Sequence, residues 1–320
     1  MKNVCIVGWG AIAPLHAYAI NGTKSAKFYA VCDINPEKIS KCKEEFDVAV
    51  GYTDFDEMLN DNSIDSVHIC TPHYLHSDMI QKALSSGKTV VCEKPVAMTK
   101  EEFTALSGKD FCPIMQNRTN PCIKKIKEIA DNKKYGELIT AKAFLTWCRT
   151  KEYYDSADWR GNFSTEGGGV LINQAVHTLD FMSYLTGGIK SVSADIMNYS
   201  LKGEIEVEDT VVAHLTFKNG KSGIFFATNA YGKDSSPHLE IEFEKACIRY
   251  VDKKLFIDGI EIMSDDVPIL GKECWGGGHQ EQIKNFYDEN SYLSVKDIEN
   301  TMLSLYAIYE STNTGKEVTL

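Results

Sequence analysis

The stretch VCIVGWGAIA, residues 4–13, decides the fold of this chain. Its first four residues form a short apolar run that is typical of a buried parallel strand. The next six match the pattern G-x-G-x-x-A, and Pro14 suits the first turn of a helix because proline has no backbone donor to satisfy. Gly8 permits a tight turn, Gly10 lets the backbone approach a pyrophosphate, and the small Ala13 allows close helix–strand packing. The stretch predicts a dinucleotide-binding turn.

A carboxylate follows this motif at the expected distance. The run FYAVCD reads as a second strand that ends in Asp33, where a carboxylate can hydrogen-bond a ribose 2′-hydroxyl. An acid there disfavours a 2′-phosphate, which favours NAD, although the nearby Lys38 leaves NADP open. We expect the backbone at Ala11 and Ile12, where the helix begins, to face the pyrophosphate.

Strand and helix patterns alternate through the first 115 or so residues, which predicts a doubly wound α/β Rossmann domain with a parallel sheet. Residues 67–72 and 89–95 read as strands, and residues 79–86 as a helix closed by Gly87. Ligands bind such sheets beyond the carboxyl ends of the strands. The residues expected at that edge beside the glycine turn are Thr71, Pro72, His76, Glu93, Lys94 and Pro95.

The pattern changes after about Asn117. Residues 210–217 alternate in polarity, residues 218–221 carry a strong hairpin signal, and further short strands continue as a meander. We expect residues 1–117 to form the Rossmann domain and residues 118–320 an α+β domain with a large, mostly antiparallel open sheet, whose C-terminal helix can pack back on the first domain. The open face of that sheet is either solvated or an interface in a homodimer or homotetramer.

Composition excludes several classes of protein. At 320 residues, with 43% hydrophobic and 25% charged residues, the chain is an ordinary globular protein large enough for two domains. A net charge of −11 argues against nucleic acid or an anionic membrane as partner. The N-terminal apolar run has only strand length, so we expect neither a signal peptide nor a membrane span. Ten scattered cysteines without metal-site spacing favour free thiols, a cytoplasmic location and no bound metal.

The segment GGGVLINQAVHTLD, residues 167–180, is the second informative stretch. It reads as three glycines running into an apolar-periodic helix that carries Asn173 and His177 one turn apart on one face. One interpretation is a substrate pocket with a proton-transfer group. The other is a capped core helix with a satisfied histidine.

Together these motifs closely resemble the Gfo/Idh/MocA family of oxidoreductases, which includes glucose–fructose oxidoreductase and inositol dehydrogenase. The resemblance runs from end to end. It rests on GWGAIA with Asp33, CTPHYLHSDMIQKALSSGKTVVCEKP (70–95), QNRTNP (116–121), YYDSADWRGNFSTEGGGVLINQAVHTLD (153–180), GGGHQEQI (276–283) and Gly315-Lys316.

The resemblance implies nicotinamide-dependent oxidation or reduction at a hydroxyl-bearing carbon of a sugar, a cyclitol or a sugar derivative. It also implies that Lys94 is catalytic and that a cis peptide bond precedes Pro95. A histidine has an ordinary pKa near neutrality, so His177 suits removal of the substrate's hydroxyl proton, while Lys94 can stabilise the developing alkoxide charge. Asn173 departs from inositol-type members, which carry an aspartate there, and an amide can only hydrogen-bond. Asp180 either orients His177 or pairs elsewhere.

Several further residues are candidates for the substrate site. Aromatic faces and a guanidinium can stack on a sugar ring and bond its hydroxyls or a carboxylate. The candidates are Tyr153, Tyr154, Trp159 and Arg160, with Arg118 and His279 weaker; a plain packing loop is the alternative for the tyrosines, and His76 is expected to be mainly structural.

Two other functions remain open. Some members of this fold hydrolyse glycosides by transient oxidation with a tightly held NAD, and a non-catalytic galactose-pathway co-repressor shares the architecture. Because both Lys94 and His177 are present, the sequence favours the dehydrogenase.

Overall fold

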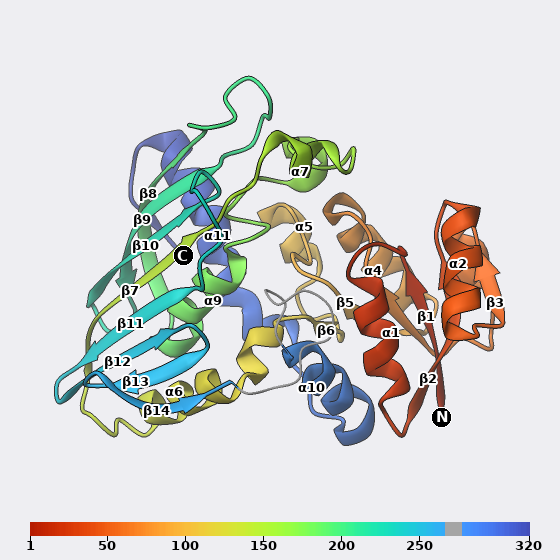
Figure 1. Cartoon of the computed structure of the whole chain (residues 1–320), viewed down its shortest axis with the longest axis horizontal. Coiled ribbons are helices and arrows are strands. Elements are labelled where there is room, and N and C mark those ends of the chain that lie inside the picture. Colours follow the sequence, from red (N-terminus) through yellow and green to blue (C-terminus); the bar gives the residue numbers. More distant parts are fainter. Residues whose placement is uncertain (266–276) are drawn as a thin grey trace. The chain divides into compact units, whose positions relative to one another are not determined.

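The structure, a computed structural model, describes residues 1–265 and 277–320 of the chain. These fold into two compact units (Figure 1). Of the described residues, the first unit comprises Met1–Ala97, Glu101–Thr119 and 277–297; the second comprises Met98–Lys100, 120–265 and Ile298–Leu320.

The first unit is built on a six-stranded parallel sheet of order β3-β2-β1-β4-β5-β6. Its strands are β1 (Lys2–Val7), β2 (Ala26–Cys32), β3 (Val50–Tyr52), β4 (Ser66–Ile69), β5 (Thr89–Cys92) and β6 (Cys112–Pro113). The strand order reverses at β1, and β1 pairs with β2 on one side and β4 on the other. This is the predicted doubly wound sheet, and the carboxyl ends of β1, β2, β4 and β5 meet at one edge.

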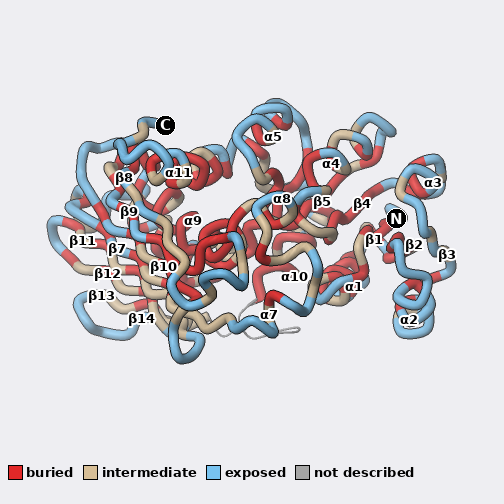
Figure 2. Tube along the Cα trace, turned by 90° about the horizontal axis from the view of Figure 1, so that it is seen from above, coloured by how far each residue is buried: buried red, intermediate tan, exposed pale blue. Residues whose placement is uncertain are grey.

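Helices connect these strands as the sequence patterns predict. They are α1 (Ala13–Asn21), α2 (Pro36–Phe46), α3 (Phe55–Leu59), η1 (His73–Leu75), α4 (His76–Ser85), α5 (Lys100–Ala105), η2 (Gln116–Thr119), α10 (Gly278–Lys284) and the π-helical η4 (Asn285–Glu289). Pro14 lies in the first turn of α1, and Asn35 caps α2 by accepting from the N–H of Glu37. Figure 2 shows α1 largely buried and α2 largely exposed, in keeping with the apolar and charged sequences of these helices.

The division predicted at residues 117 and 118 differs from the observed one, because residues 277–297 belong to the first unit. Helix α10 packs on α1. Its Gln282 donates to Pro113 O at 2.7 Å and accepts from the N–H of Met115 at 3.1 Å. These are contacts between residues more than 160 positions apart, which sequence periodicity does not report.

The second unit contains a nine-stranded sheet of order β14-β13-β12-β11-β7-β10-β9-β8-β15, in which only β7 and β10 are parallel. Its strands are β7 (Leu138–Thr146), β8 (Ile189–Met197), β9 (Thr210–Phe217), β10 (Ser222–Thr228), β11 (His238–Phe243), β12 (Ala246–Val251), β13 (Lys254–Ile257), β14 (Ile260–Ser264) and β15 (Val318–Thr319). The predicted hairpin joins β9 to β10, and Gly220 adopts φ +81° in its turn.

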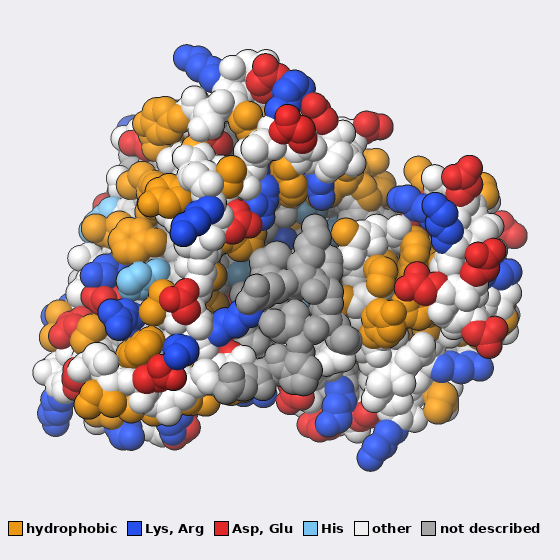
Figure 3. Space-filling view, viewed as in Figure 1, with side chains coloured by type: hydrophobic (Ala, Val, Ile, Leu, Met, Phe, Trp, Pro, Cys, Tyr) orange, Lys and Arg blue, Asp and Glu red, His pale blue; other side chains and the backbone are white. Residues whose placement is uncertain are grey.

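Five helices belong to this unit: α6 (Pro121–Asp131), α7 (Lys151–Asp155), α8 (Phe163–Glu166), α9 (Val176–Leu185) and α11, which spans Val295–Thr314 and joins the unit from Ile298. Helix α9 packs on β7 and on α6. The opposite face of the central strands carries part-exposed apolar side chains, among them Ile139, Val212 and Ile224. In Figure 3 hydrophobic side chains over these strands are interspersed with charged ones. Within the described residues, no helix is long and apolar enough to cross a membrane.

One predicted helix is shorter than expected. The sequence predicts a continuous helix from the three glycines to Leu185, but α9 starts only at Val176 and residues 170–175 form turns. The backbone at the glycines is not helical, because Gly167 adopts φ +84° and Gly168 φ +155°. The N–H groups of Gly169 and Leu171 donate to the Glu208 carboxylate at 2.9 and 3.0 Å, which holds the segment in this conformation. Asn173 therefore lies in a turn before the helix that carries His177.

Candidate active site

The glycine turn after β1 has the shape of a dinucleotide cradle. Gly8 adopts φ +85°, and a Cβ there would lie 2.8 Å from Cys70 O, so no other residue fits. A Cβ on Gly10 would meet nothing within 4 Å, which leaves open space beside the backbone. Helix α1 starts at Ile12 without a side-chain cap, so its N-terminal N–H groups are available to an anion. The turn fits a pyrophosphate.

Asp33 follows β2 at the same edge and is 7% exposed. Its Oδ2 accepts from the N–H of Trp9 at 2.7 Å, and its Oδ1 accepts from the N–H of Asn35 at 2.9 Å. Lys38 Nζ lies 3.8 Å from Oδ2. The carboxylate is thus fixed beside the glycine turn, where it can meet a ribose hydroxyl.

The segments after β4 and β5 are tied to each other by His76. One ring nitrogen lies 2.7 Å from Pro95 O, and the other lies 2.8 Å from Thr71 O. Burial lowers the pKa of His76. The expected cis bond between Lys94 and Pro95 is present. Thr71, Pro72 and Lys94 therefore lie at one edge of the sheet, and His76 joins the two segments there.

A buried cluster lies directly behind Lys94. Glu93 Oε1 is 3.0 Å from His16 Nε2 and 3.1 Å from His279 Nε2, and its Oε2 accepts from the N–H of Lys94 at 3.3 Å. Burial alone would raise the pKa of Glu93, but the two imidazoles outweigh it and hold that pKa well below its usual range. Among the described residues, these three side chains form a group whose possible metal-ligand atoms lie within 4.8 Å of one another. The hydrogen bonds between the side chains account for these short distances.

The cluster continues through the sheet. His16 Nδ1 lies 2.8 Å from His68 Nδ1, and His68 Nε2 lies 2.8 Å from the hydroxyl of Tyr287. Burial lowers the pKa of His68 and that of His279. Sequence patterns alone did not single out His16 or His68, although a histidine inside the apolar strand SVHI must find a partner when buried. The neighbouring Gly276 of the GGGHQEQI motif lies outside the described residues.

In the second unit, a buried carboxylate holds the triple-glycine loop. Glu208 accepts from the backbone at Gly169 and Leu171 and from the hydroxyl of Tyr309 at 3.1 Å. A Cβ on Gly169 would lie 1.9 Å from Glu208 O, and a Cβ on Gly168 would lie 1.9 Å from the Tyr309 hydroxyl oxygen. The glycines are required by this close approach of the backbone.

A second carboxylate, Glu166, meets Asn173. The Asn173 amide donates to Oε1 at 2.6 Å, and the N–H of Gly161 donates to Oε2 at 2.6 Å. Burial raises the pKa of Glu166 to about 7, despite the lowering effect of these two donors. His177 is partly exposed on the first turn of α9. The sequence indicated Asn173 but not its acidic partner, seven positions earlier.

Aromatic and guanidinium groups surround this turn as the sequence suggested. The Tyr153 hydroxyl accepts from Gln174 Nε2 at 2.9 Å. Arg160 lies 4.3 Å from the centroid of the Tyr153 ring and 5.3 Å from that of Trp159, and its Nη1 donates to Tyr153 O at 3.2 Å. Its Nε is buried and has no hydrogen-bond partner among the described residues. Tyr154 is buried, and its hydroxyl accepts from Asn229 Nδ2 at 3.3 Å.

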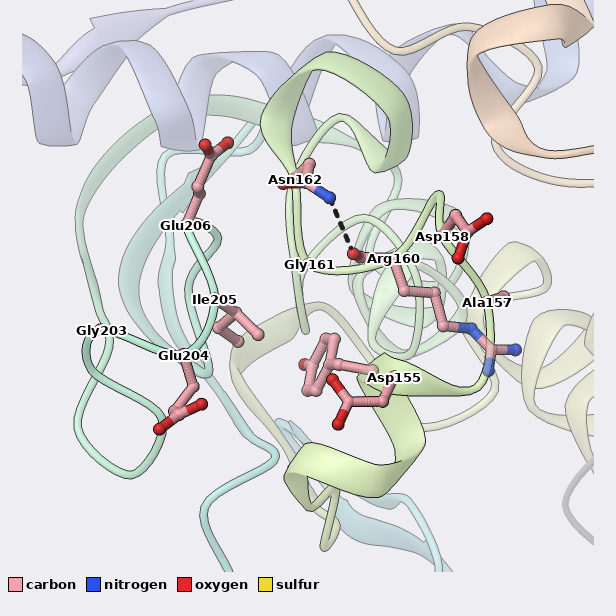
Figure 4. A pocket seen from close by; sticks show the side chains of 11 residues that line it. Asp155, Ala157, Asp158, Arg160, Gly161, Asn162, Gly203, Glu204, Ile205 and Glu206 are labelled. Atoms are coloured by element: carbon pink, nitrogen blue, oxygen red, sulfur yellow. Dashed lines mark hydrogen bonds between the residues drawn. The ribbon is translucent and has the colours of Figure 1, made fainter.

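A pocket of about 510 Å³ opens on one side of Arg160 (Figure 4). Its lining includes Tyr154 as well as Arg160, but neither Asn173 nor His177. Four carboxylates dominate it: Asp155, Asp158, Glu204 and Glu206. In Figure 4, Asp155 comes from the end of α7, Asp158 from the loop before Arg160, and Glu204 and Glu206 from the loop of residues 203–206. The pocket is a neighbour of the proposed proton-transfer site rather than the site itself.

Two other candidates are placed differently. Arg118 is 6% exposed, and its Nη1 donates to Asp297 O at 3.0 Å within the first unit, which is a structural contact. Asp180 accepts from the hydroxyl of Thr301 at 2.7 Å, so it pairs with α11. Lys94 belongs to the first unit, whereas Asn173 and His177 belong to the second.

The chain matches two family descriptions. Residues 2–108 match "Oxidoreductase family, NAD-binding Rossmann fold", and residues 123–249 match "GFO/IDH/MocA C-terminal domain". The chain is 25% identical to myo-inositol 2-dehydrogenase of Thermotoga maritima over 99% of this chain and 98% of the relative. It is 28% identical to the uncharacterized oxidoreductase YrbE of Bacillus subtilis over 68% of this chain and 64% of the relative.

A solved structure is similar over the whole chain. It is the WlbA dehydrogenase of Chromobacterium violaceum in complex with NADH and UDP-GlcNAcA. The two chains superpose with a TM-score of 0.86 at 27% identity, covering 100% of this chain and 96% of the other. The glycine cradle, Asp33 and the two matched domains agree, and this chain belongs to the Gfo/Idh/MocA family of NAD-binding oxidoreductases.

Proposed function

We propose that this protein transfers a hydride between NAD and a hydroxyl-bearing carbon of a sugar, a cyclitol or a sugar derivative, with Lys94 and His177 acting on the substrate oxygen and its proton. The observation that carries the proposal is the shared edge of the first sheet. The glycine turn, Asp33 and Lys94 all follow the carboxyl ends of neighbouring strands there. Relatives named for inositol substrates support the substrate class.

The first unit holds the cofactor. The N–H groups at the start of α1 bind the pyrophosphate, Gly10 admits it, and Asp33 accepts from a ribose hydroxyl. When bound, the nicotinamide supplies the hydride acceptor or donor. A carboxylate already held by two backbone N–H groups disfavours a 2′-phosphate beside it, which is the reason to expect NAD rather than NADP.

Lys94 and His177 divide the remaining work. The Lys94 ammonium stabilises the negative charge that develops on the substrate oxygen as its proton leaves. The His177 imidazole takes that proton, since neutral imidazole is the prevailing form of an ordinary histidine at neutral pH. Asn173, held at Nδ2 by Glu166, hydrogen-bonds a neighbouring hydroxyl. Arg160, Trp159 and Tyr154 complete the substrate side.

A substrate screen tests the activity. Sugars, cyclitols and nucleotide sugars are incubated with NAD or NADP, and absorbance of the reduced nicotinamide is followed. We expect NAD reduction with at least one polyol and a lower KM for NAD than for NADP. Release of sugar from a glycoside without net change in absorbance would instead identify a glycosidase, and binding without turnover would identify a regulator.

Lys94→Ala tests the catalytic assignment. We expect kcat to fall by about 10³-fold, because a positioned charge at the developing alkoxide contributes roughly 4 kcal/mol. Affinity for NAD, measured by calorimetry, should change little. Lys82→Ala is the matched control, since Lys82 lies exposed on α4 of the same unit. Retention of most of the activity in Lys94→Ala would show that the reacting oxygen has another partner.

We also propose that a second copy of the chain covers the open face of the second sheet. Ile224 is 51% exposed there and lies opposite His214 and Lys142 on the flanking strands. Exposed apolar groups on a long sheet favour burial in an interface. Light scattering should give a homodimer or homotetramer, and Ile224→Glu should lower the mass. A monomeric wild type would contradict the proposal.

A further inference from the structure

The buried cluster behind Lys94 is one continuous hydrogen-bonded chain within the first unit. It runs from His279 through Glu93, His16 and His68 to Tyr287, with contacts of 3.1, 3.0, 2.8 and 2.8 Å. It then reaches the Ser66 hydroxyl at 2.7 Å, which lies 3.3 Å from Thr89 O. Each of the six members is at most 9% exposed. Because these groups are shielded from water, each donor must find an acceptor within this hydrogen-bonded chain.

With one negative charge in the chain, the donors have a single consistent direction. Glu93 is ionised and accepts the Nε2–H of His16 and of His279. His16 Nδ1 then carries no proton and accepts from the Nδ1–H of His68. His68 Nε2 accepts from the Tyr287 hydroxyl, which in turn accepts from Ser66. Every donor has an acceptor.

The hydrogen-bonded chain can take up one more proton, and every donor then still has an acceptor. If His16 carries protons on both nitrogens, its Nδ1–H donates to His68 Nδ1, and the proton of His68 moves to Nε2. His68 then donates to the Tyr287 oxygen, Tyr287 donates to Ser66, and Ser66 donates to Thr89 O. All bonds between His16 and Ser66 reverse, Ser66 turns its donor to Thr89 O, and the contact between His16 and Glu93 becomes a buried ion pair.

We propose that His16 and His279 are positioning residues for Lys94 that act through Glu93, and that this chain stores one exchangeable proton by reversing its bonds. The link to Lys94 is the Glu93 carboxylate, whose Oε1 is held by the two imidazoles and whose Oε2 accepts from the Lys94 N–H. The catalytic consequence rests on the role proposed above for Lys94, whereas the proton storage does not.

The stored proton changes the charge behind Lys94. With His16 neutral, the cluster carries a charge of −1 and attracts the ammonium; with His16 protonated, its net charge is zero. The other ionisable groups that act on the cluster are His76 on α4, Lys94, Asp65 and three thiols. Lys94 acts on His279 and His76, and Asp65 acts on Tyr287. The thiols are those of Cys70 and Cys92 next to Glu93 and of Cys112 next to Tyr287. Burial keeps His76 and the three thiols in their neutral forms by lowering the pKa of the imidazole and raising the pKa of each thiol. A proton gained within the hydrogen-bonded chain therefore changes the field behind Lys94.

Nitrogen NMR of the histidines in the intact protein tests the stored proton without using activity. In ¹⁵N-histidine-labelled protein, long-range proton–nitrogen spectra report which ring nitrogen of each residue is protonated. At high pH we expect protons on His16 Nε2 and His68 Nδ1. On acidification, His16 should become doubly protonated, and the His68 proton should move to Nε2 in the same step, with His68 remaining neutral. His16→Gln supplies the assignment of that residue.

Two kinds of result would overturn the proposal. The first comes from the NMR experiment: the His68 tautomer stays unchanged while His16 gains its proton, or His68 itself becomes charged. The other is about one equivalent of bound divalent metal in the purified protein, because a cation held by His16, Glu93 and His279 would replace the hydrogen bonds. Elemental analysis of the purified protein shows whether such a metal is bound.

Kinetics test the positioning role. His16→Gln keeps a donor toward Glu93 but cannot become charged, so we expect kcat to fall by about 10–100-fold, with the KM for NAD changed by less than about twofold. The acidic limb of the pH–rate profile should also flatten. Lys82→Gln, on the exposed side of α4, is the control. A normal kcat and an unchanged pH profile in His16→Gln would refute positioning, whereas an active Lys94→Ala would refute only the function proposed for Lys94.

Discussion

Glu93 in the first unit and Glu166 in the second are both buried carboxyl groups, yet their surroundings have opposite effects. Glu93 accepts from two imidazoles, which can carry charge, and its pKa stays well below the usual range. Glu166 accepts from the amide of Asn173 and the backbone of Gly161, and its pKa rises to about 7. Burial raises the pKa of both carboxyls, so the kind of partner decides the outcome.

This difference decides which of the two carboxyl groups can change its charge near neutral pH. Glu93 remains ionised across the physiological range and serves as a fixed negative charge behind Lys94. Glu166 is poised to gain or lose a proton near neutrality, next to the Asn173 amide. It is therefore the rival of His177 as the proton-transfer group of the second unit.

The largest expected effect separates these two rivals. We predict that His177→Ala lowers kcat by about 10²–10⁴-fold and removes the neutral limb of the pH–rate profile, because a general base contributes that much. Glu166→Gln should retain the limb. Asn173→Ala, which removes only hydrogen bonds, should act mainly by raising the substrate KM. Steady-state kinetics across pH measure all three.

The reverse pattern would assign the base to Glu166. It would consist of a limb that persists in His177→Ala and disappears in Glu166→Gln. Asn173→Asp provides a further check, since it adds a carboxylate beside Glu166 without touching His177. We expect the added carboxylate to be unnecessary for activity, so kcat should stay near its wild-type value. A large gain in kcat would show that the amide limits the wild-type enzyme.

A smaller effect should appear in stability. The pKa of Glu166 is about 7 in the folded protein against about 4.5 in the unfolded chain, so the folded state binds the extra proton between these values. The unfolding free energy should therefore decrease by roughly 3 kcal/mol as pH rises from about 4.5 to above 7. Glu93, with its lowered pKa, contributes stability that is lost only at acidic pH.

Urea unfolding at a series of pH values measures this dependence. In Glu166→Gln the decrease between pH 5 and pH 8 should be about 3 kcal/mol smaller than in the wild type. Glu101→Gln, at an exposed carboxyl group on α5, should leave the pH dependence as it is in the wild type. An unfolding free energy that does not decrease over this interval would mean that Glu166 is ionised in the folded protein throughout.

Much of the fold follows from local pattern. The run from Val4 to Ala13 predicts β1, the turn and α1, and the segment 210–217 coincides with β9. These succeed because neighbouring residues decide them: a buried strand needs an apolar run, and a turn needs Gly8 at positive φ. The predicted start of α9 was wrong, because Gly167 and Gly168 adopt positive φ angles in a loop that the distant Glu208 carboxylate holds through backbone N–H groups.

The candidate site also contains residues that local motifs indicate and contacts that no local motif indicates. Lys94, Asp33 and His177 were found through motifs of short sequence span, and the cis bond at Pro95 came from the family resemblance. The sequence indicated Glu93 and His279 but neither His16 nor the contacts among the three residues. Glu93 is 77 residues from His16 and 186 residues from His279, and no local pattern connects them.

The sequence by itself determined the class of this protein: a Rossmann sheet with an NAD cradle, an acid for the ribose, and lysine and histidine in the motifs of an oxidoreductase. Only the tertiary structure decided the charge states behind those groups. A carboxyl's pKa depends on what surrounds it once water has been removed, and that environment is assembled from segments far apart in the chain. Identical side chains, Glu93 and Glu166, thus acquire opposite behaviour from folding alone.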